Sequence, residues 1–327
     1  MPAKCATPEG TARYRERFPD RHFNVQHGLV LSSIGIGTYL GNPDAATDLN
    51  YTRAIVRAVQ LGVNVIDTAA NYRFQRSERA IGEALKILAN EHGIAREELF
   101  ICTKGGYLPF DGAPPQSVAQ YVNETFVKPG IASFDDFVGG SHCMTPSYLQ
   151  SQIDQSLRNM GIDGVDVYYI HNPESQLPYV SEEEFYARLK RAFERLEENR
   201  RQGKLAHYGV ATWNGFRMPP NSGQHHSLTR MVELAREVGG EEHGFHFIQL
   251  PFNVRMPEAT SVIEEAQRLG VSVITSASLL QGRIPPQTAI EFVRSTPGIT
   301  TALIGMSSVE HVEENLGRGL TRMKADE

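Results

Sequence analysis

Three residues that can carry charge or move a proton come at the ends of short apolar runs. Asp67 ends the run VNVID, Lys104 ends LFICTK and His171 ends VDVYYIH, while Tyr72 lies five residues after Asp67. Charged groups at the ends of buried strands cost desolvation energy unless they pair. A self-satisfied Asp67–Lys104 ion pair would be the plainest interpretation of any one of these residues. All of them together favour a functional cluster.

The chemistry that such a cluster supports is proton donation to a carbonyl oxygen. A tyrosine has an ordinary pKa of about 10, and a neighbouring cation lowers it. We therefore expect Lys104 to lower the pKa of Tyr72 and Asp67 to hold Lys104 charged and in place. His171 would bind the substrate oxygen while Tyr72 protonates it and a hydride reaches the carbon.

The elements that must position these residues alternate along the chain. β-branched apolar runs, typical of strands, cover residues 32–38, 63–68, 99–104, 165–172, 206–212, 245–252, 271–277 and 300–305. Amphipathic patterns, typical of helices, cover residues 47–61, 77–91, 146–160, 182–202, 226–238, 259–269, 286–295 and 308–317. Residues that could cap these helices precede or begin five of them, at Thr47, Ser77, Thr145, Ser181 and Ser308.

Eight strand–helix units indicate a parallel sheet with right-handed crossovers, which can close into a (β/α)8 TIM barrel. The alternative is an open doubly wound sheet, which would normally carry GxGxxG after its first strand. The first strand here reads GIGTYLG from Gly35 to Gly41, one residue too long and without a clear helix directly behind it. We therefore predict the barrel. The carboxyl ends of its strands would bring Asp67, Lys104 and His171 into one mouth.

The 327 residues are expected to form one barrel domain over residues 1–327. Two stretches lie outside the eight units: an N-terminal arm, residues 1–31, and a loop after the third strand, residues 105–144. A long loop at this position is expected to lie over the active-site face and to shape the substrate pocket. Its many aromatic residues favour an apolar or aromatic carbonyl substrate.

Several segments together resemble the aldo-keto reductases. They are DTAANY after the second strand, the Lys104 strand end, IHNP at the fourth strand, and GIGTYLG, YGVATWNG, FIQLPFN and LIGMSSVEHVEENL further along. The resemblance extends from about residue 31 to residue 316. It implies a TIM barrel that reduces an aldehyde or ketone to an alcohol with NADPH, or with NADH as the less favoured cofactor.

The resemblance also assigns roles to individual residues. The catalytic tetrad would be Asp67, Tyr72, Lys104 and His171, with Tyr72 as the general acid. Residues at the cofactor positions would be Gly37, Thr38, Asn172, Thr212, Gln249, Ser276, Leu279, Gly305, Ser307, Ser308, His311, Glu314 and Asn315. Gln249 would bind the nicotinamide carboxamide, and Glu314 and Asn315 the adenine. Tyr39 and Trp213 would line the substrate pocket.

Two other functions remain open. A strand-end lysine such as Lys104 could form a Schiff base in a lyase or aldolase, although Asp67 would keep it protonated. The chain could also be a non-catalytic or very slow NADP(H)-binding regulatory or sensor protein of the same fold. Its oligomeric state and physiological substrate are not readable from the sequence.

Composition argues against other classes of protein. With 32 basic and 38 acidic residues the net charge is −6, which does not favour a nucleic acid or an anionic membrane as partner. We see no signal peptide or membrane span and expect a cytoplasmic protein. Three widely spaced cysteines do not form a disulfide framework, and His243 and His246 lack an obvious third ligand, so no metal site is expected.

Overall fold

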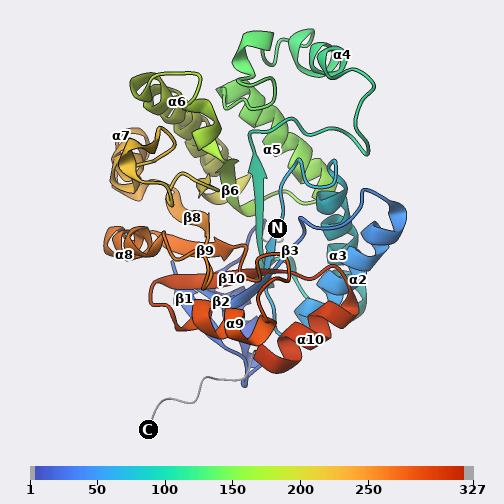
Figure 1. Ribbon diagram of the computed structural model, residues 1–327. Helices are drawn as coiled ribbons and strands as arrows, with labels where there is room; N and C mark the ends of the chain where they lie inside the picture. Colours follow the sequence, from blue (N-terminus) through green and yellow to red (C-terminus); the bar gives the residue numbers. More distant parts are fainter. Residues whose placement is uncertain (1–3, 320–327) are drawn as a thin grey trace.

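Eight parallel strands form a closed barrel at the centre of the computed structural model, which describes residues 4–319 (Figure 1). Around the barrel the strand order is β10-β3-β4-β5-β6-β7-β8-β9. The strands are β3 (Ile34–Gly37), β4 (Val65–Asp67), β5 (Phe100–Gly105), β6 (Val165–His171), β7 (Leu205–Ala211), β8 (Phe245–Pro251), β9 (Ser272–Ser276) and β10 (Ile299–Gly305). This arrangement confirms the predicted (β/α)8 barrel and excludes the open sheet.

A helix follows each barrel strand and packs on its outer face. These helices are α2 (Ala45–Gln60), α3 (Arg76–His92), α5 (Pro146–Met160), α6 (Glu182–Arg201), α7 (Leu228–Gly239), α8 (Thr260–Leu269), α9 (Pro286–Ser295) and α10 (Val309–Gly319). Their bounds differ from the predicted ones by one or two residues at most ends. The spacing of apolar residues in the sequence was therefore sufficient to find every helix of the barrel.

The helix caps divide into correct and wrong predictions. Ser181 caps α6 by accepting a hydrogen bond from the Glu184 amide at 3.2 Å, and Ser308 lies just ahead of α10. Thr47 is not a cap, because α2 begins earlier and Asp44 accepts the Thr47 amide instead. Ser77 is also inside its helix, and its hydroxyl donates to the carbonyl of Thr38. In the first case Asp44 takes the capping position, and in the second the Thr38 carbonyl binds the hydroxyl that was expected to cap the helix.

Two apolar layers hold the barrel together. Inside the strands, one cluster contains Val65, Phe100, Tyr169 and Phe247, all fully buried. A larger cluster lies between the strands and the surrounding helices. Burial of this kind is worth roughly 25 cal/mol per Å² of apolar surface, so these layers supply the rigid frame on which the strand ends are held.

The N-terminal arm is structured, which its sequence pattern did not show us. It contains α1 (Pro8–Glu16) and a hairpin of β1 (Phe23–Gln26) and β2 (Leu29–Ser32). Leu29 and Leu31 pack into the cluster inside the barrel. The hairpin therefore closes the end of the barrel where the strands begin. Thr7 followed by Pro8 is a helix-start signal that could have revealed α1.

Histidines gather beside this hairpin. His27, in the hairpin turn, stacks on His246 with ring centroids 4.5 Å apart, and His207 Nδ1 lies 3.0 Å from His246 Nδ1. Burial lowers the pKa of His207 to about 3 and that of His246 to about 4. Within residues 4–319 no group of three or more His, Cys, Asp or Glu side chains is arranged to hold a metal ion.

The segment of residues 105–144 differs in part from the expected lid. It contains α4 (Val118–Val122) and has an apolar core of its own, in which Phe126 and Phe137 pack on Tyr148 of α5. In Figure 1 this segment stands beyond α5, at the opposite edge of the molecule from α9 and α10. Only its two ends reach the mouth of the barrel. Most of its aromatic residues therefore stabilise the segment itself and give no support to an aromatic substrate.

None of the helices in the described part of the chain has the length and apolar character needed to cross a membrane.

Candidate active site at the barrel mouth

The four predicted catalytic residues meet at the carboxyl ends of β4, β5 and β6. Lys104 Nζ donates to Asp67 Oδ1 at 2.5 Å and to the carbonyl of Thr68 at 2.7 Å. The same ammonium lies 5.0 Å from the centroid of the Tyr72 ring. The ring centroids of Tyr72 and His171 are 5.8 Å apart, edge to face. The buried Asp67–Lys104 ion pair, the Tyr72 phenol and the His171 imidazole therefore lie next to one another in that order.

The pKa values of this cluster partly correct our expectation. Burial raises the pKa of Tyr72 above its ordinary value, and Lys104 opposes this shift without cancelling it. Burial alone would lower the pKa of Lys104, but Asp67 and Tyr72 raise it above its usual value. Burial, helped by Lys104 and His142, holds the pKa of His171 well below its usual value. At neutral pH the site therefore holds a protonated phenol, a charged lysine and a neutral imidazole.

A strained turn carries Tyr72. The next three residues, Arg73, Phe74 and Gln75, have φ values of 49°, 58° and 68°, in the left-handed region that favours glycine. The segment 105–144 supports this turn, since Gln75 Nε2 donates to the carbonyl of Pro109 at 2.9 Å and the Gly112 amide donates to the carbonyl of Phe74 at 2.9 Å. Such strain persists only where the surroundings enforce it.

Two residues predicted to bind cofactor also contact Asp67. Gln249, on β8, donates from Nε2 to Asp67 Oδ2 at 2.8 Å. The Thr38 hydroxyl, just after β3, donates to the carbonyl of Asp67 at 3.1 Å. Both oxygens of the Asp67 carboxylate are therefore bonded within the protein, which fixes the lysine that it holds.

Other predicted cofactor residues are buried but leave polar atoms without partners. Thr212, after β7, is 4% exposed, and its hydroxyl has no hydrogen-bond partner among the described residues. Asn315, in α10, is 5% exposed, and its Oδ1 is likewise unpaired within residues 4–319. Unpaired buried polar atoms cost about 1–3 kcal/mol each, so they commonly indicate a missing partner.

The start of α10 presents further polar groups. Ser308 Oγ accepts the amide of His311 at 3.3 Å, and the Ser307 hydroxyl lies 3.4 Å from His311 Nδ1. Glu314 lies one turn further along α10. The first turn of a helix of this length offers free amides and a positive dipole end to an anion.

The remaining predicted cofactor residues lie at neighbouring strand ends. Gly37 and Gly305 pair side by side across β3 and β10, and the Leu40 side chain lies 3.1 Å from where a Cβ of residue 305 would be. Ser276 ends β9 and pairs with Pro251 of β8. Leu279 lies in the connection to α9, where Leu280 and two neighbours have positive φ values. Asn172 directly follows His171 and adopts φ 43°.

A pocket of about 460 Å³ opens beside the tetrad. It is lined by Tyr107, Val138, Gly139, Ser141, His142, Asn172, Glu174, Ser175, Pro178, Tyr179, Trp213, Asn214 and Gln224. The Tyr107 ring packs against the His171 ring at 5.2 Å, which joins the pocket to the catalytic cluster. Trp213 lines the pocket as predicted. Tyr39 packs edge to face on Tyr72, the predicted general acid, with ring centroids 5.0 Å apart.

Glu174 holds the loop that carries Trp213. This buried carboxylate accepts hydrogen bonds from the amides of Trp213 at 2.7 Å and Asn214 at 2.8 Å, and its other oxygen lies 3.3 Å from His226 Nε2. Burial opposes its ionisation, but these bonds leave the pKa of Glu174 below its usual value. The pocket wall is therefore anchored to a buried charge.

Sequence reasoning missed Glu174, His142 and Gln176 as residues of the site. Glu174 lies two residues beyond the IHN strand end, so an acidic residue on that strand's loop was a usable signal. His142 had no such signal, because its neighbour in space is residue 171. The adjacent Cys143 is fully buried, and burial raises its pKa to about 11, so it is an unreactive thiol.

Comparison with known proteins agrees with this geometry. L-glyceraldehyde 3-phosphate reductase of Escherichia coli is 26% identical over 93% of this chain and 72% of its own length. Glycerol dehydrogenase AKR11B4 from Gluconobacter oxydans has a TM-score of 0.64 at 17% identity, covering 94% of this chain and 91% of that one. An aldo-keto reductase from Klebsiella pneumoniae, solved in complex with NADPH, has a TM-score of 0.59 at 17% identity, covering 91% and 89%. The model of the Aldo/keto reductase family matches residues 33–285, most of the chain, and the chain therefore belongs to the aldo/keto reductase family.

Proposed function

We propose that this protein is an NADPH-dependent oxidoreductase that reduces an aldehyde or ketone to an alcohol, with Tyr72 as the general acid. The observation that carries the proposal is the series Asp67–Lys104–Tyr72–His171 at the barrel mouth, in which a buried ion pair adjoins a half-buried phenol and imidazole. We also propose that residues 1–327 act as one barrel domain, because the arm and the segment 105–144 both pack on the barrel.

The proton step depends on the charge state of Tyr72. Its raised pKa keeps the phenol protonated at neutral pH, so a proton is available for transfer. Lys104 lies 5.0 Å from the ring and stabilises the phenolate that forms when the proton leaves. Asp67 keeps Lys104 charged throughout. The same 2.5 Å ion pair argues against Lys104 as a Schiff-base nucleophile, which must be neutral.

His171 would orient the substrate carbonyl. Its ring faces Tyr72 edge to face, and its lowered pKa keeps it neutral, so it can donate one N–H to an oxygen without carrying charge. A carbonyl oxygen placed between the phenol and the imidazole would receive a hydrogen bond from each. The carboxyl ends of β7 and β10 open at the same mouth, because the barrel strands are parallel.

The residues there fit a nicotinamide dinucleotide. When bound, NADPH would supply the hydride that reduces the carbon. The unpaired Thr212 hydroxyl and Asn315 Oδ1 offer hydrogen bonds at the two ends of such a cofactor. Ser307 and Ser308 at the start of α10 suit its phosphates. The related structure solved with NADPH supports this cofactor, and NADH is the second one to test.

The pocket beside the tetrad suits a small carbonyl compound with polar substituents. Asn172, Ser175, Asn214 and Gln224 supply amide and hydroxyl groups, and Tyr107, Tyr179 and Trp213 supply aromatic faces. Its volume of about 460 Å³ lies within the ordinary range for small-molecule sites. We infer that the pocket binds the part of the substrate away from the reacting carbonyl.

The direct test is turnover of the reduced cofactor by the purified protein with a panel of aldehydes and ketones. We expect NADPH to be consumed with at least one polar aldehyde and Tyr72→Phe to lose this activity while still binding NADPH. Binding of NADPH with turnover that is the same in Tyr72→Phe would instead support the regulatory role. Absence of both NADPH and NADH binding would exclude both functions.

A further inference from the structure

A line of hydrogen bonds connects the end of the catalytic strand β6 to an arginine pocket on the surface. His142 Nε2 lies 2.8 Å from the carbonyl oxygen of His171. Gln176 Nε2 lies 2.9 Å from His142 Nδ1, and Arg188 Nη1 lies 2.8 Å from Gln176 Oε1. None of these three side chains belongs to the catalytic tetrad, yet together they reach it.

The chemistry of the end groups determines the direction of every hydrogen bond in this line. Arginine can only donate, so Gln176 Oε1 is the acceptor and Gln176 Nε2 must be the donor to His142 Nδ1. His142 Nδ1 then carries no hydrogen, and its Nε2–H donates to the carbonyl of His171. A carbonyl can only accept, so both ends of the line require the same tautomer of His142.

His142 is built into the protein at this point. It is 1% exposed, and Gln176 is fully buried. The ring leaves no room for a side chain at Gly106, where a Cβ would lie 2.8 Å from His142 Nε2. The Tyr107 ring packs edge to face on it at 5.0 Å and on His171 at 5.2 Å. Small shifts of His142 would therefore be transmitted to His171.

The His171 carbonyl needs a partner because β6 ends there. The following residue, Asn172, has φ 43° and turns the chain away from the strand direction. The last paired residues of β5 and β6 are Gly105 and Ile170, so β5 provides no partner residue for His171. His142 takes that position from the far end of the segment 105–144.

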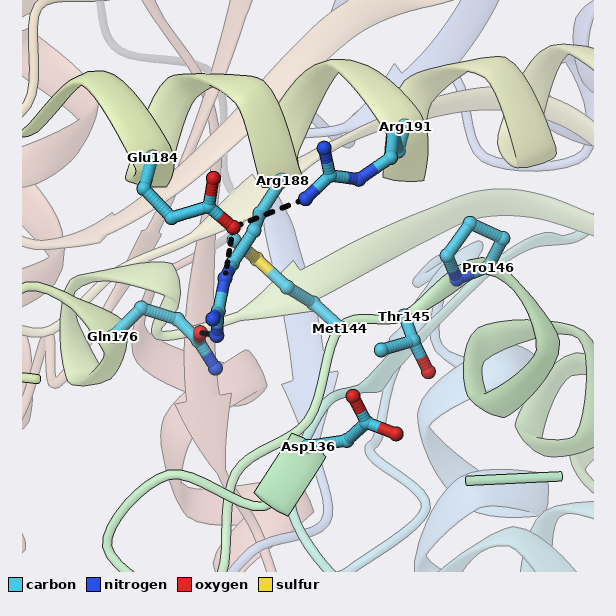
Figure 2. Close-up of a pocket in the computed structure, with 8 residues that line it drawn as sticks. All are labelled: Asp136, Met144, Thr145, Pro146, Gln176, Glu184, Arg188 and Arg191. Carbon is cyan, nitrogen blue, oxygen red and sulfur yellow. Dashed lines mark hydrogen bonds and ion pairs between the residues drawn. The ribbon is translucent and has the colours of Figure 1, made fainter. Parts of the chain in front are cut away.

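The outer end of the line is fixed by charge. Figure 2 shows Glu184 bonded to both Arg188 and Arg191, and Arg188 also bonded to Gln176. The distances from Glu184 Oε1 are 2.8 Å to Arg188 Nε and 3.1 Å to Arg191 Nη2. The pocket around these residues measures about 180 Å³. Arg188 is therefore held on one side and can direct Gln176 on the other.

We propose that Arg188, Gln176 and His142 form a positioning relay that holds the end of β6, and with it the His171 imidazole, in place for carbonyl reduction. The assignment of His171 to carbonyl binding rests on the proposed function, whereas the relay itself is a property of the fold. His142 lines the pocket proposed for the substrate but reaches the tetrad only through the His171 carbonyl and the Tyr107 ring, so its proposed role is to position His171.

The relay makes a prediction that needs no activity. In ¹⁵N-resolved NMR spectra of the whole protein, His142 should show a protonated Nε2 and an unprotonated Nδ1, without titration between about pH 5 and about pH 8. Arg188→Met should shift or broaden the His142 Nδ1 signal while Nε2 stays protonated, because Gln176 loses the donor that orients its amide and the His171 carbonyl still requires the same tautomer. Arg191→Met is the matched control, since Arg191 binds Glu184 but not Gln176, and should leave His142 unchanged. A protonated Nδ1 in the parent protein would overturn the relay.

The positioning role is tested with two substitutions at His142. Gln can donate from Nε2 and accept at Oε1, whereas Leu can do neither. We expect His142→Leu to shift or broaden the His171 ring signals and to lower kcat about 10- to 100-fold with NADPH affinity unchanged. His142→Gln should restore both. Unchanged His171 signals in folded His142→Leu would refute the positioning role of His142, even if the protein reduces no carbonyl. Changed signals in a protein that reduces no carbonyl would refute only the proposed function.

Discussion

The two sides of the barrel mouth differ in how far their polar groups are already satisfied. On the substrate side, which we define as the ends of β4, β5 and β6 with the segment 105–144, Asp67, Lys104 and His142 are bonded within the protein. On the cofactor side, the ends of β7 and β10 with α10, the Thr212 hydroxyl and Asn315 Oδ1 have no partner within the described chain. The charged groups of the first side are thus paired before any ligand arrives, whereas the second side holds unpaired polar atoms that a ligand can bind.

This difference predicts which substitutions should destabilise the protein and which should only weaken ligand binding. A buried polar group that is hydrogen-bonded stabilises the fold. Its removal leaves the partner buried without a hydrogen bond or counter-charge, which lowers the free energy of unfolding. An unpaired buried group already costs free energy, so its loss relieves the fold and harms only the ligand. Stability and binding should therefore respond in opposite ways on the two sides.

The largest effect is expected at the buried ion pair. Lys104→Met would leave the Asp67 carboxylate without its 2.5 Å partner and should lower the free energy of unfolding by about 3–5 kcal/mol. Activity should be lost as well. Urea unfolding measures the first effect. The double variant Asp67→Asn, Lys104→Met should recover most of the stability but none of the activity, and a stable single variant would show that the pair is not a structural support.

Tyr72→Phe should separate activity from stability on the same side. Loss of the general acid is expected to lower kcat by about 10²- to 10⁴-fold. The ring contacts with Tyr39 and His171 would remain, so the unfolding midpoint should hardly change. Near-parental kcat in steady-state assays would contradict the role given to Tyr72.

Acid should weaken the substrate side through His142. Burial lowers the pKa of His142 to about 4, from an ordinary value of 6.5, so the folded state favours the neutral ring. As pH falls below about 6.5, the unfolded chain binds a proton that the folded chain does not, and stability is lost progressively down to about pH 4, by up to about 3 kcal/mol. The free energy of unfolding of His142→Gln, measured over this range, should fall less steeply. Equal slopes would place the acid sensitivity elsewhere.

The smallest effect is expected on the cofactor side. Thr212→Val keeps the shape of the side chain and removes its unpaired hydroxyl, so it should raise the free energy of unfolding by about 1 kcal/mol. NADPH should bind about 5- to 10-fold more weakly, since one hydrogen bond is lost. Isothermal titration measures the expected loss of NADPH affinity, and urea unfolding measures the expected gain in the free energy of unfolding. A destabilised variant with unchanged NADPH affinity would remove the contrast between the two sides.

The catalytic cluster was predictable because its positions depend on periodicity alone. Apolar runs marked the strands, and parallel strands bring their carboxyl ends to one mouth, so Asp67, Lys104 and His171 had to meet there. The position of Tyr72 near this mouth was predictable because it lies only five residues after Asp67. The net pKa of Tyr72 did not follow, because the burial that raises it depends on residues such as Tyr39 and His171 packed around the ring.

Local apolar patterns and strand direction were enough to specify the barrel, its helices and the meeting of Asp67, Tyr72, Lys104 and His171 at one mouth. Only the tertiary structure decided that the arm plugs the barrel, that most of the segment 105–144 packs beside α5, and that His142 supports His171. The reason is physical. These features depend on contacts between distant parts of the chain, such as the packing of Leu29 and Leu31 in one cluster with Phe247, and no local pattern encodes which distant groups become neighbours.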